Sequence, residues 1–178
     1  MDKKGSFKPV VIALIISMLI ALFWNNLNFL KNIVHTILDP SAGALINWQL
    51  EIGMLLIVLI LTLITTLIQK YTTDQNALKD LKREQKALQK EMKEHKGNPQ
   101  KLMELQKKSF EFLPRTFKLS MRSFAYTAIP LLLFFRWFMD FFQSINNPKF
   151  FGFLGWFLFY LLFSIIFSSI LRKVLKVA

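Results

Sequence analysis

The chain of 178 residues contains no cysteine, which excludes disulfide bonds, thiolate nucleophiles and cysteine-ligated metal sites. It also lacks the GxxxxGK[ST] phosphate loop, the HExxH zinc helix, the GxSxG nucleophile motif and the glycine pattern of dinucleotide-binding folds. The two histidines, His35 and His95, are far apart in the sequence and suggest no metal site. We therefore expect a protein that is not an enzyme and that uses no cofactor or metal.

Acidic residues are scarce, with 11 Asp and Glu against 23 Lys and Arg, whereas 53% of the residues are hydrophobic. The hydrophobic residues are gathered in blocks, which is typical of a membrane protein. A helix needs roughly 20 apolar residues to cross the hydrocarbon of a bilayer. Four blocks are candidate spans, the first being the shortest: residues 10–24, 52–68, 124–142 and 150–171.

The positive charges alternate along the chain between these blocks. About a dozen Lys and Arg lie between the second and third blocks, but the first and second blocks, like the third and fourth, are separated by one each. Because cytoplasmic loops carry the excess of Lys and Arg, this pattern places both termini and residues 70–121 in the cytoplasm. The sequence thus predicts a multi-pass protein of the plasma membrane with a cytoplasmic C-terminus.

The chain divides into two predicted units. Residues 1–50 form an N-terminal hydrophobic segment followed by an outer segment, and residues 51–178 form the membrane core. In the outer segment, apolar residues recur at helical spacing over 27–38 and stop at Asp39-Pro40, which indicates a short helix at the outer interface. A simple linker is the alternative interpretation of this segment.

Residues 72–114 are predicted to form a coiled-coil hairpin in the cytoplasm. Apolar and neutral residues recur at alternating steps of three and four, which indicates a narrow seam on a charged helix. Gly97 is expected in the left-handed position after this helix, Asn98 as the N-cap and Pro99 as the first residue of a second helix, which would end at Pro114. The predicted fold class is an all-α membrane protein: a helical bundle of three core spans, a short N-terminal hydrophobic helix and this hairpin. The seam consists of Leu78, Leu81, Gln85, Leu88, Met92 and His95.

The hairpin has a basic surface that favours a polyanionic partner. The ribosome, contacted through its RNA, a soluble targeting factor and anionic lipid headgroups are all compatible with it, although interspersed Asp and Glu weaken a purely nucleic-acid interpretation. The alternative interpretation is that the hairpin is only a solvated connector between two spans. A connector would need far fewer residues, so the length of the hairpin favours a binding role. The basic residues of this recruitment face are Lys79, Lys82, Arg83, Lys86 and Lys90.

Polar residues fall at the cytoplasmic ends of three spans. Hydroxyl side chains in membrane helices often serve only packing. Here, however, each of the three spans carries a row of polar residues, which we call a polar stripe, at the same depth in the membrane. Together the three stripes predict a hydrated groove that is open to the cytoplasm. Arg122 either faces this groove or reaches to the headgroups, and Arg136 and Asp140, one turn apart, are expected to pair. The candidate groove residues are Thr62, Thr65, Thr66, Gln69, Arg122, Ser123, Tyr126, Thr127, Ser164 and Ser168.

The order of parts resembles a known superfamily. The chain resembles the YidC/Oxa/Alb insertases, in particular their archaeal YidC-like branch. The shared order is a span, a hairpin with GNPQKLMELQKK at its turn, a span with PLLLFF at 130–135 and a last span. This resemblance implies an insertase or chaperone that moves the polar flank of nascent membrane proteins through a hydrophilic groove without nucleotide hydrolysis. In bacterial members the span before the hairpin carries a groove arginine. The corresponding residues 52–68 contain no arginine here, and Arg122, on the other side of the hairpin, can substitute for it.

The alternative function is a non-catalytic membrane receptor or scaffold whose hairpin binds the ribosome or a targeting factor. The oligomeric state is left open.

Overall fold

The computed structural model describes residues 7–177, with the backbone alone for residues 7–9 and Arg122. Three helical segments are long and apolar enough to cross a membrane: α4 (Leu50–Thr72), the part Ser123–Ser144 of α6 (Pro99–Ser144), and α7 (Trp156–Val174). These segments correspond to the second, third and fourth predicted spans. The prediction of an all-α membrane protein with three core spans is confirmed.

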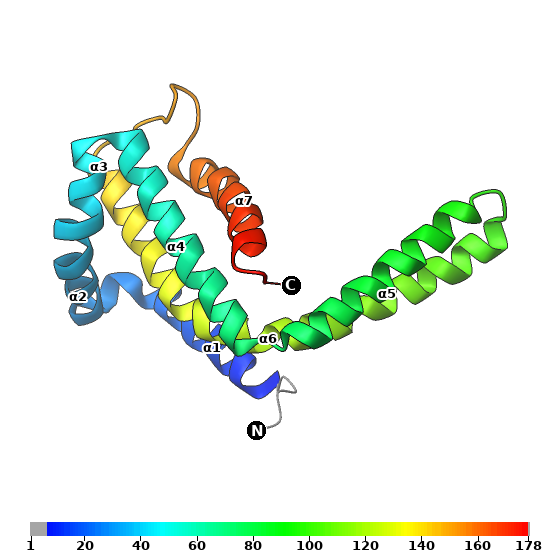
Figure 1. Ribbon diagram of the computed structural model, residues 1–178. Helices are drawn as coiled ribbons and strands as arrows, with labels where there is room; N and C mark the ends of the chain where they lie inside the picture. The colour runs from blue at the N-terminus through cyan, green and yellow to red at the C-terminus, as the bar shows by residue number, and fades with distance from the viewer. Residues whose placement is uncertain (1–6, 178) are drawn as a thin grey trace.

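The helix α4 lies between the spanning part of α6 and α7 (Figure 1). We call the end of this bundle from which the hairpin leaves the hairpin side, and the end with the loop between α6 and α7 the loop side. The last helix begins at Trp156 and not near residue 150, because Phe151 and Gly152 have φ of 51° and 82°. A right-handed helix cannot contain residues with positive φ.

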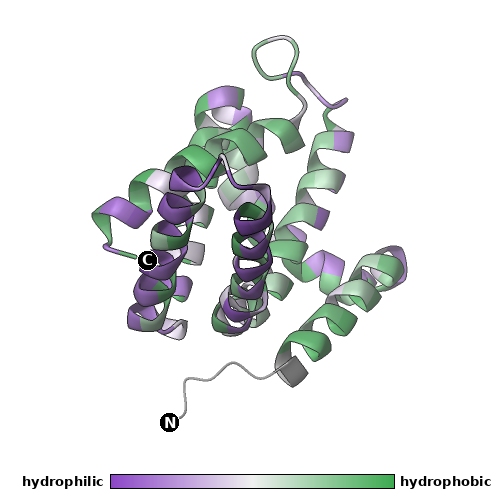
Figure 2. Ribbon diagram, turned by 90° about the vertical axis from the view of Figure 1, so that its right-hand side faces the viewer, coloured by the Kyte–Doolittle hydropathy of each residue, from purple (hydrophilic) through white to green (hydrophobic). Residues whose placement is uncertain are grey.

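The N-terminal helix α1 (Phe7–Phe23) packs along α6 and is apolar over most of its length (Figure 2). Its 17 residues are fewer than a membrane span normally requires. After the short 3₁₀ turn η1 (Trp24–Asn26), the chain bends by 92° and continues toward the loop side. Residues 10–26 therefore qualify as a spanning element only together with the bent segment that follows them.

The predicted outer helix is present as α2 (Asn28–Leu38). The α-helix ends at Leu38, directly before Asp39-Pro40 as predicted, and the chain then continues through the π-helical turn η2 (Asp39–Gly43) into α3 (Ala44–Trp48). The corner between α3 and α4 is a close backbone contact. A Cβ atom on Gly53 would lie 2.1 Å from the carbonyl oxygen of Leu45, so this position requires glycine.

The hairpin consists of α5 (Gln75–Glu94) and the first part of α6, which run side by side away from the bundle (Figure 1). Asn98 caps α6 by accepting a hydrogen bond from the Lys101 amide at 3.1 Å, and Pro99 is the first helical residue. Gly97 does not have the left-handed backbone that the sequence predicted. His95 instead ends α5, donating its backbone N–H to the Glu91 carbonyl, so the turn closes without positive φ.

The prediction that the second hairpin helix ends at Pro114 is wrong, because α6 runs unbroken for 46 residues through Pro114 and Pro130. A proline removes one backbone hydrogen bond from a helix, and packing on either side can compensate. Close to Pro114 the helix packs against α5, where Gln85 donates to the Thr116 hydroxyl at 3.5 Å, and α6 also packs against α1. The hairpin arm and a membrane span are thus parts of one helix.

The hydrophobic core is concentrated toward the loop side and is rich in aromatic residues. α6 contributes consecutive buried rings that face α2, η2 and α7. Fully buried aromatic side chains are Trp24, Trp137, Phe138, Phe142, Phe150 and Phe159.

Candidate functional site

Two adjoining cavities lie between α4, α6 and α7 on the hairpin side, and we call them together the groove. Their volumes are about 270 and 440 Å³, and they share the lining residues Thr65, Thr127, Ser168 and Arg172. The structure brings together residues from all three predicted polar stripes. The predicted residues that line the groove are Thr62, Thr65, Thr66, Gln69, Ser123, Thr127, Ser164 and Ser168.

Two residues of the predicted set are not placed in the groove. Tyr126 lines neither cavity, and its side chain is 60% exposed on another face of α6. Arg122 belongs to α6, but its side chain is outside the described part of the structure. Conversely, Ser120 and Tyr160 line the groove although they were not among the candidates.

The threonine hydroxyls of the groove bond to the backbone of their own helices. Thr62 donates to the Val58 carbonyl at 2.6 Å, Thr65 and Thr66 donate to the Thr62 carbonyl at 3.0 and 2.6 Å, and Thr127 donates to the Ser123 carbonyl at 3.1 Å. Each hydroxyl oxygen has two lone pairs and only one hydrogen. Once the hydrogen is used on the backbone, the oxygen serves as an acceptor, so these side chains offer the groove acceptors rather than donors.

Arg172 in the last turn of α7 supplies the positive charge of the groove. Its Nη2 donates to the side-chain oxygen of Gln69 at 3.0 Å, and its Nε is buried without a hydrogen-bond partner. The sequence contained a signal for this residue, because Ser164, Ser168 and Arg172 follow one another at steps of four and therefore share a helix face. The sequence analysis assigned the groove charge to Arg122 instead, as a substitute for the groove arginine of the bacterial insertases.

The groove is closed toward the loop side by aromatic contacts between α6 and α7. Phe135 contacts Tyr160 edge to face with ring centroids 4.9 Å apart, and Phe142 stacks on Trp156 at 5.8 Å. All the ring contacts between these two helices involve α6 residues from Phe135 onward and the first turns of α7. On the hairpin side, the polar cavities separate the two helices instead.

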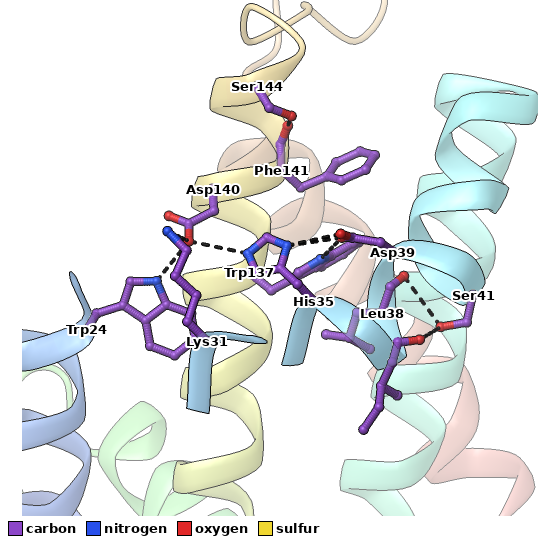
Figure 3. A network of polar contacts seen from close by, with 11 residues as sticks. Trp24, Lys31, His35, Leu38, Asp39, Ser41, Trp137, Asp140, Phe141 and Ser144 are labelled. Atoms are coloured by element: carbon purple, nitrogen blue, oxygen red, sulfur yellow. Dashed lines mark hydrogen bonds and ion pairs between the residues drawn. The ribbon is translucent and has the colours of Figure 1, made fainter. Parts of the chain in front are cut away.

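A second polar cluster lies on the loop side and ties the N-terminal helices to α6 (Figure 3). Asp140 accepts a hydrogen bond from the indole of Trp24 at 2.8 Å, forms an ion pair with Lys31 at 3.0 Å and lies 3.4 Å from Nε2 of His35. The Trp137 indole donates to Asp39 at 2.7 Å, and His35 also contacts Asp39. Asp140 of α6 is thus held by groups from η1 and α2, and Asp39 is held by Trp137 of α6 and His35 of α2.

The expected pairing of Arg136 with Asp140 is wrong. Arg136 lies over the Trp24 ring, 5.6 Å from its centroid, as a cation–π contact. Asp140 is occupied by Trp24 and by the α2 residues Lys31 and His35. Within residues 7–177, no group of three or more His, Asp or Glu side chains is placed to hold a metal ion.

The basic recruitment face predicted on the hairpin lies on α5, and all its members are exposed. Arg83 pairs with Asp80 at 3.7 Å on the same helix. Lys82 differs from the others because partial burial of its ammonium lowers its pKa, and the nearby charges of Arg172 and Lys86 lower it further.

Comparison with known proteins agrees with this architecture. The family model for integral membrane proteins described as EMC3/TMCO1-like matches residues 35–154, about two thirds of the chain. The chain belongs to the EMC3/TMCO1-like family. This family is part of the Oxa1/YidC/Alb3/EMC3 superfamily of insertase-related membrane proteins, so the superfamily resemblance seen in the sequence is confirmed.

The match to the EMC3/TMCO1-like family runs from α2 to the loop before α7. It covers two walls of the groove, formed by α4 and α6, and does not include the third wall with Ser164, Ser168 and Arg172. No match was found among curated proteins or among solved structures.

Proposed function

We propose that this member of the EMC3/TMCO1-like family is a membrane-protein insertase of the archaeal YidC-like branch. The observation that carries the proposal is the shape of the groove, which is polar on the hairpin side and ends at aromatic contacts on the loop side. In this proposal the hairpin is cytoplasmic and the protein lies in the plasma membrane. Basic residues at the hairpin-side ends of α4 and α7, Lys70, Arg172 and Lys173, support this orientation.

The physical basis is the cost of moving polar groups through hydrocarbon. Each unsatisfied backbone or side-chain polar group costs several kcal/mol in the bilayer core. A groove with hydroxyl acceptors and space for water shortens the distance over which the polar flank of a client is unsatisfied. The apolar segment of the client can then leave the groove sideways into lipid, so that no nucleotide is needed.

The hairpin recruits the client in this proposal. Its exposed basic residues would contact the ribosome through its RNA, or a targeting factor that carries the nascent chain. Because α6 is continuous from the hairpin into the wall of the groove, a ribosome bound to the hairpin would be held at a fixed position relative to the groove.

The test is photo-crosslinking to stalled ribosome–nascent-chain complexes that carry a membrane-protein client. A photoreactive amino acid at Thr65, which lines both cavities, is expected to capture the nascent chain. The matched control is Leu63, which lies on α4 at nearly the same depth and lines neither cavity. Equal capture from both positions, or capture of lipid alone from Thr65, would rule out a client-binding groove.

The second candidate function is a membrane receptor or scaffold. It is favoured by a separate cavity of about 450 Å³ between α5 and α6 on the hairpin, lined by charges of both signs that could bind a soluble partner. The two functions differ in the role of the groove. If valine and alanine replace the groove hydroxyls and client insertion is unchanged, the receptor function is the better account. The charged residues of this hairpin cavity are Glu84, Glu91, Lys108, Glu111 and Arg115.

A further inference from the structure

One side of α6 in the hairpin carries a row of exposed apolar side chains. Met103, Phe110 and Phe117 follow one another at steps of seven residues. Leu113 lies between the last two, so the four side chains share one helix face, and each is between 58% and 68% exposed. Apolar residues that are exposed singly are normal, whereas a contiguous row of them indicates a binding surface. We call these four residues the apolar stripe.

The cavity between α5 and α6 lies on the opposite side of the hairpin from this stripe. A helix turns by about 100° per residue, so a position two residues further along points to nearly the opposite side. Three residues of the stripe come two positions after a residue that lines the cavity. The hairpin thus has two faces, which we call the stripe face and the cavity face. The pairs are Lys108 and Phe110, Glu111 and Leu113, and Arg115 and Phe117.

The acidic residues of the hairpin helices share the cavity face. Glu84, Glu91 and Glu111 line the cavity itself. The other acidic residues are three, four or seven positions from one of these and therefore lie on the same side of their helix. Within α5 and residues 99–121 of α6, the stripe face is thus left without an acidic residue. The other acidic residues of the hairpin are Asp80, Glu94 and Glu104.

Lysines of α5 border the apolar stripe. Lys86 and Lys93 come two positions after acidic residues of the cavity face, so they point to the stripe face. Lys82 is one turn before Lys86 and lies on the same side of α5. The two helices therefore form one surface that is apolar on α6 and basic on α5. An apolar row beside cations, without carboxylates, is typical of helices that lie on an anionic membrane.

The stripe continues into the wall of the groove. Ser120 comes seven residues after Leu113, and Phe124 comes seven residues after Phe117. Both line a groove cavity together with residues of α7. The hairpin extends sideways from the ends of the spans, on the side of the bundle where α7 lies (Figure 1). The side of α6 that faces α7 in the bundle is therefore directed, along the hairpin, toward the level of the span ends.

This sideways direction decides where the stripe lies relative to the bilayer. At 1.5 Å per residue, Phe110 is about 20 Å along the helix from Ser123, where the membrane span begins. An arm that continued along the axis of the span would hold Phe110 beyond the headgroup region, which is roughly 5 to 8 Å deep on each side of the hydrocarbon. An arm that extends sideways keeps the whole stripe near the level of the headgroups.

We infer that the stripe face of the hairpin lies on the membrane, with the apolar stripe inserted among the lipids of the leaflet on the hairpin side and Lys82, Lys86 and Lys93 beside the phosphates of anionic headgroups. The cavity face is then directed to the aqueous phase. The inference goes beyond the proposed function, because the contact needs neither a client nor a ribosome. Client crosslinking at Thr65 can fail while the hairpin still contacts lipid, and the reverse can also occur.

The test is electron paramagnetic resonance of the full-length protein in vesicles of phosphatidylcholine and phosphatidylglycerol. Because the chain has no cysteine, one spin label can be attached at Phe110→Cys or at Phe117→Cys. Oxygen concentrates in hydrocarbon and a nickel chelate stays in water, so their collision rates with the label report whether it is inserted in the bilayer. We expect both labels to collide severalfold more with oxygen than with the nickel chelate.

The control position is Glu111→Cys, which is also exposed and lies next to Phe110 on the cavity face. A label there should show the opposite preference, for the nickel chelate. Replacing the three lysines of the stripe face with glutamine together, or omitting phosphatidylglycerol, should reduce the oxygen preference of the stripe labels severalfold. Removing three cations from the cavity side should leave it unchanged. This matched variant combines Lys101→Gln, Lys108→Gln and Arg115→Gln.

The inference is overturned if the stripe labels collide mainly with the nickel chelate, or if the labels at Phe110→Cys and Glu111→Cys behave alike. It is also overturned if the stripe labels are shielded from both reagents or show dipolar broadening, because a second copy of the chain then covers the stripe. An oxygen preference that depends neither on phosphatidylglycerol nor on the three lysines would contradict their contact with headgroups. If Phe110→Cys does not fold, as judged by circular dichroism, the exposed Leu113→Cys retains the test.

Discussion

The two ends of the bundle differ in the side chains that lie between the helices. On the loop side, aromatic rings fill the space between α6 and its neighbours, and the carboxylates of Asp39 and Asp140 are held by donors from distant segments. On the hairpin side, the same helices separate around cavities whose threonine hydroxyls bond to the backbone of their own helices. The comparison indicates that the loop side holds the bundle together, whereas the polar hairpin side is the end at which we propose that a client binds.

The largest expected effect is the loss of an aromatic anchor on the loop side. Trp137→Ala removes a fully buried ring and its hydrogen bond to Asp39, and should lower the free energy of unfolding by roughly 3 kcal/mol. Chemical denaturation in detergent micelles, followed by circular dichroism, measures this change. The control is Trp48→Ala, because Trp48 is 71% exposed and should contribute little. A loss below about 1 kcal/mol for Trp137→Ala would show that the loop side is not the stabilising end.

A smaller loss is expected for Asp140→Ala, which deprives Trp24, Lys31 and His35 of their shared acceptor. We expect a loss on the order of 2 kcal/mol in the same unfolding experiment, since the donors around Asp140 are left unpaired. The matched substitution is Asp80→Ala, which breaks an exposed ion pair on the hairpin. Similar stabilities of the two variants would argue against the loop-side cluster as a structural anchor.

The hairpin side should respond in the opposite way, with function lost and stability kept. The combined variant Thr62→Val, Thr65→Val, Thr127→Val and Ser168→Ala preserves most of the side-chain volume while removing groove hydroxyls. Because the threonine hydroxyls bond only to their own helices, we expect a stability change below about 1 kcal/mol and a severalfold decrease in client insertion into proteoliposomes. Thr72→Val, whose hydroxyl bonds to the Ile68 carbonyl outside the groove, should insert normally. A large stability loss without any insertion defect would reverse the assignment of the two ends.

The smallest effect is expected at the tip of the hairpin. Asn98→Ala removes the cap of α6 and should cost on the order of 1 kcal/mol locally. Hydrogen exchange should speed up at the amide of Lys101, which loses its acceptor, and remain unchanged in the spans. Gln100→Ala, at an exposed position two residues after Asn98, serves as the control. Faster exchange at both ends of the bundle would mean that the hairpin is not an independent arm.

The three spans and most of the groove could be predicted because both depend on local rules. Apolar length identifies a span, and helical spacing identifies which polar residues share a face. Thr62, Thr65 and Gln69 were found in this way, and the structure places them in the groove. Tyr126 lies on α6 at the same membrane depth as the groove, but its side chain is on another face of the helix. The depth of a residue in the membrane does not determine the direction in which its side chain points.

The features that sequence reasoning missed depend on contacts between distant segments. The partner of Asp140 was sought one turn away at Arg136, but Lys31 and His35 lie more than 100 positions earlier in the chain. Likewise, a proline usually ends a helix, but α6 continues through Pro114 and is packed against both α5 and α1. Local rules cannot provide this information.

The most direct test of the central claim, that the hairpin side is hydrated and open whereas the surrounding helix faces are not, uses the absence of cysteine from the chain. A single cysteine at Thr65 or at Leu63 can be treated with a membrane-impermeant maleimide in proteoliposomes, with the reagent added to the side of the hairpin. The two positions lie on α4 at nearly the same depth, but only Thr65 lines the groove. We expect rapid labelling of Thr65→Cys and little labelling of Leu63→Cys. Equal labelling of the two, or labelling of Thr65→Cys only from the opposite side, would contradict the account.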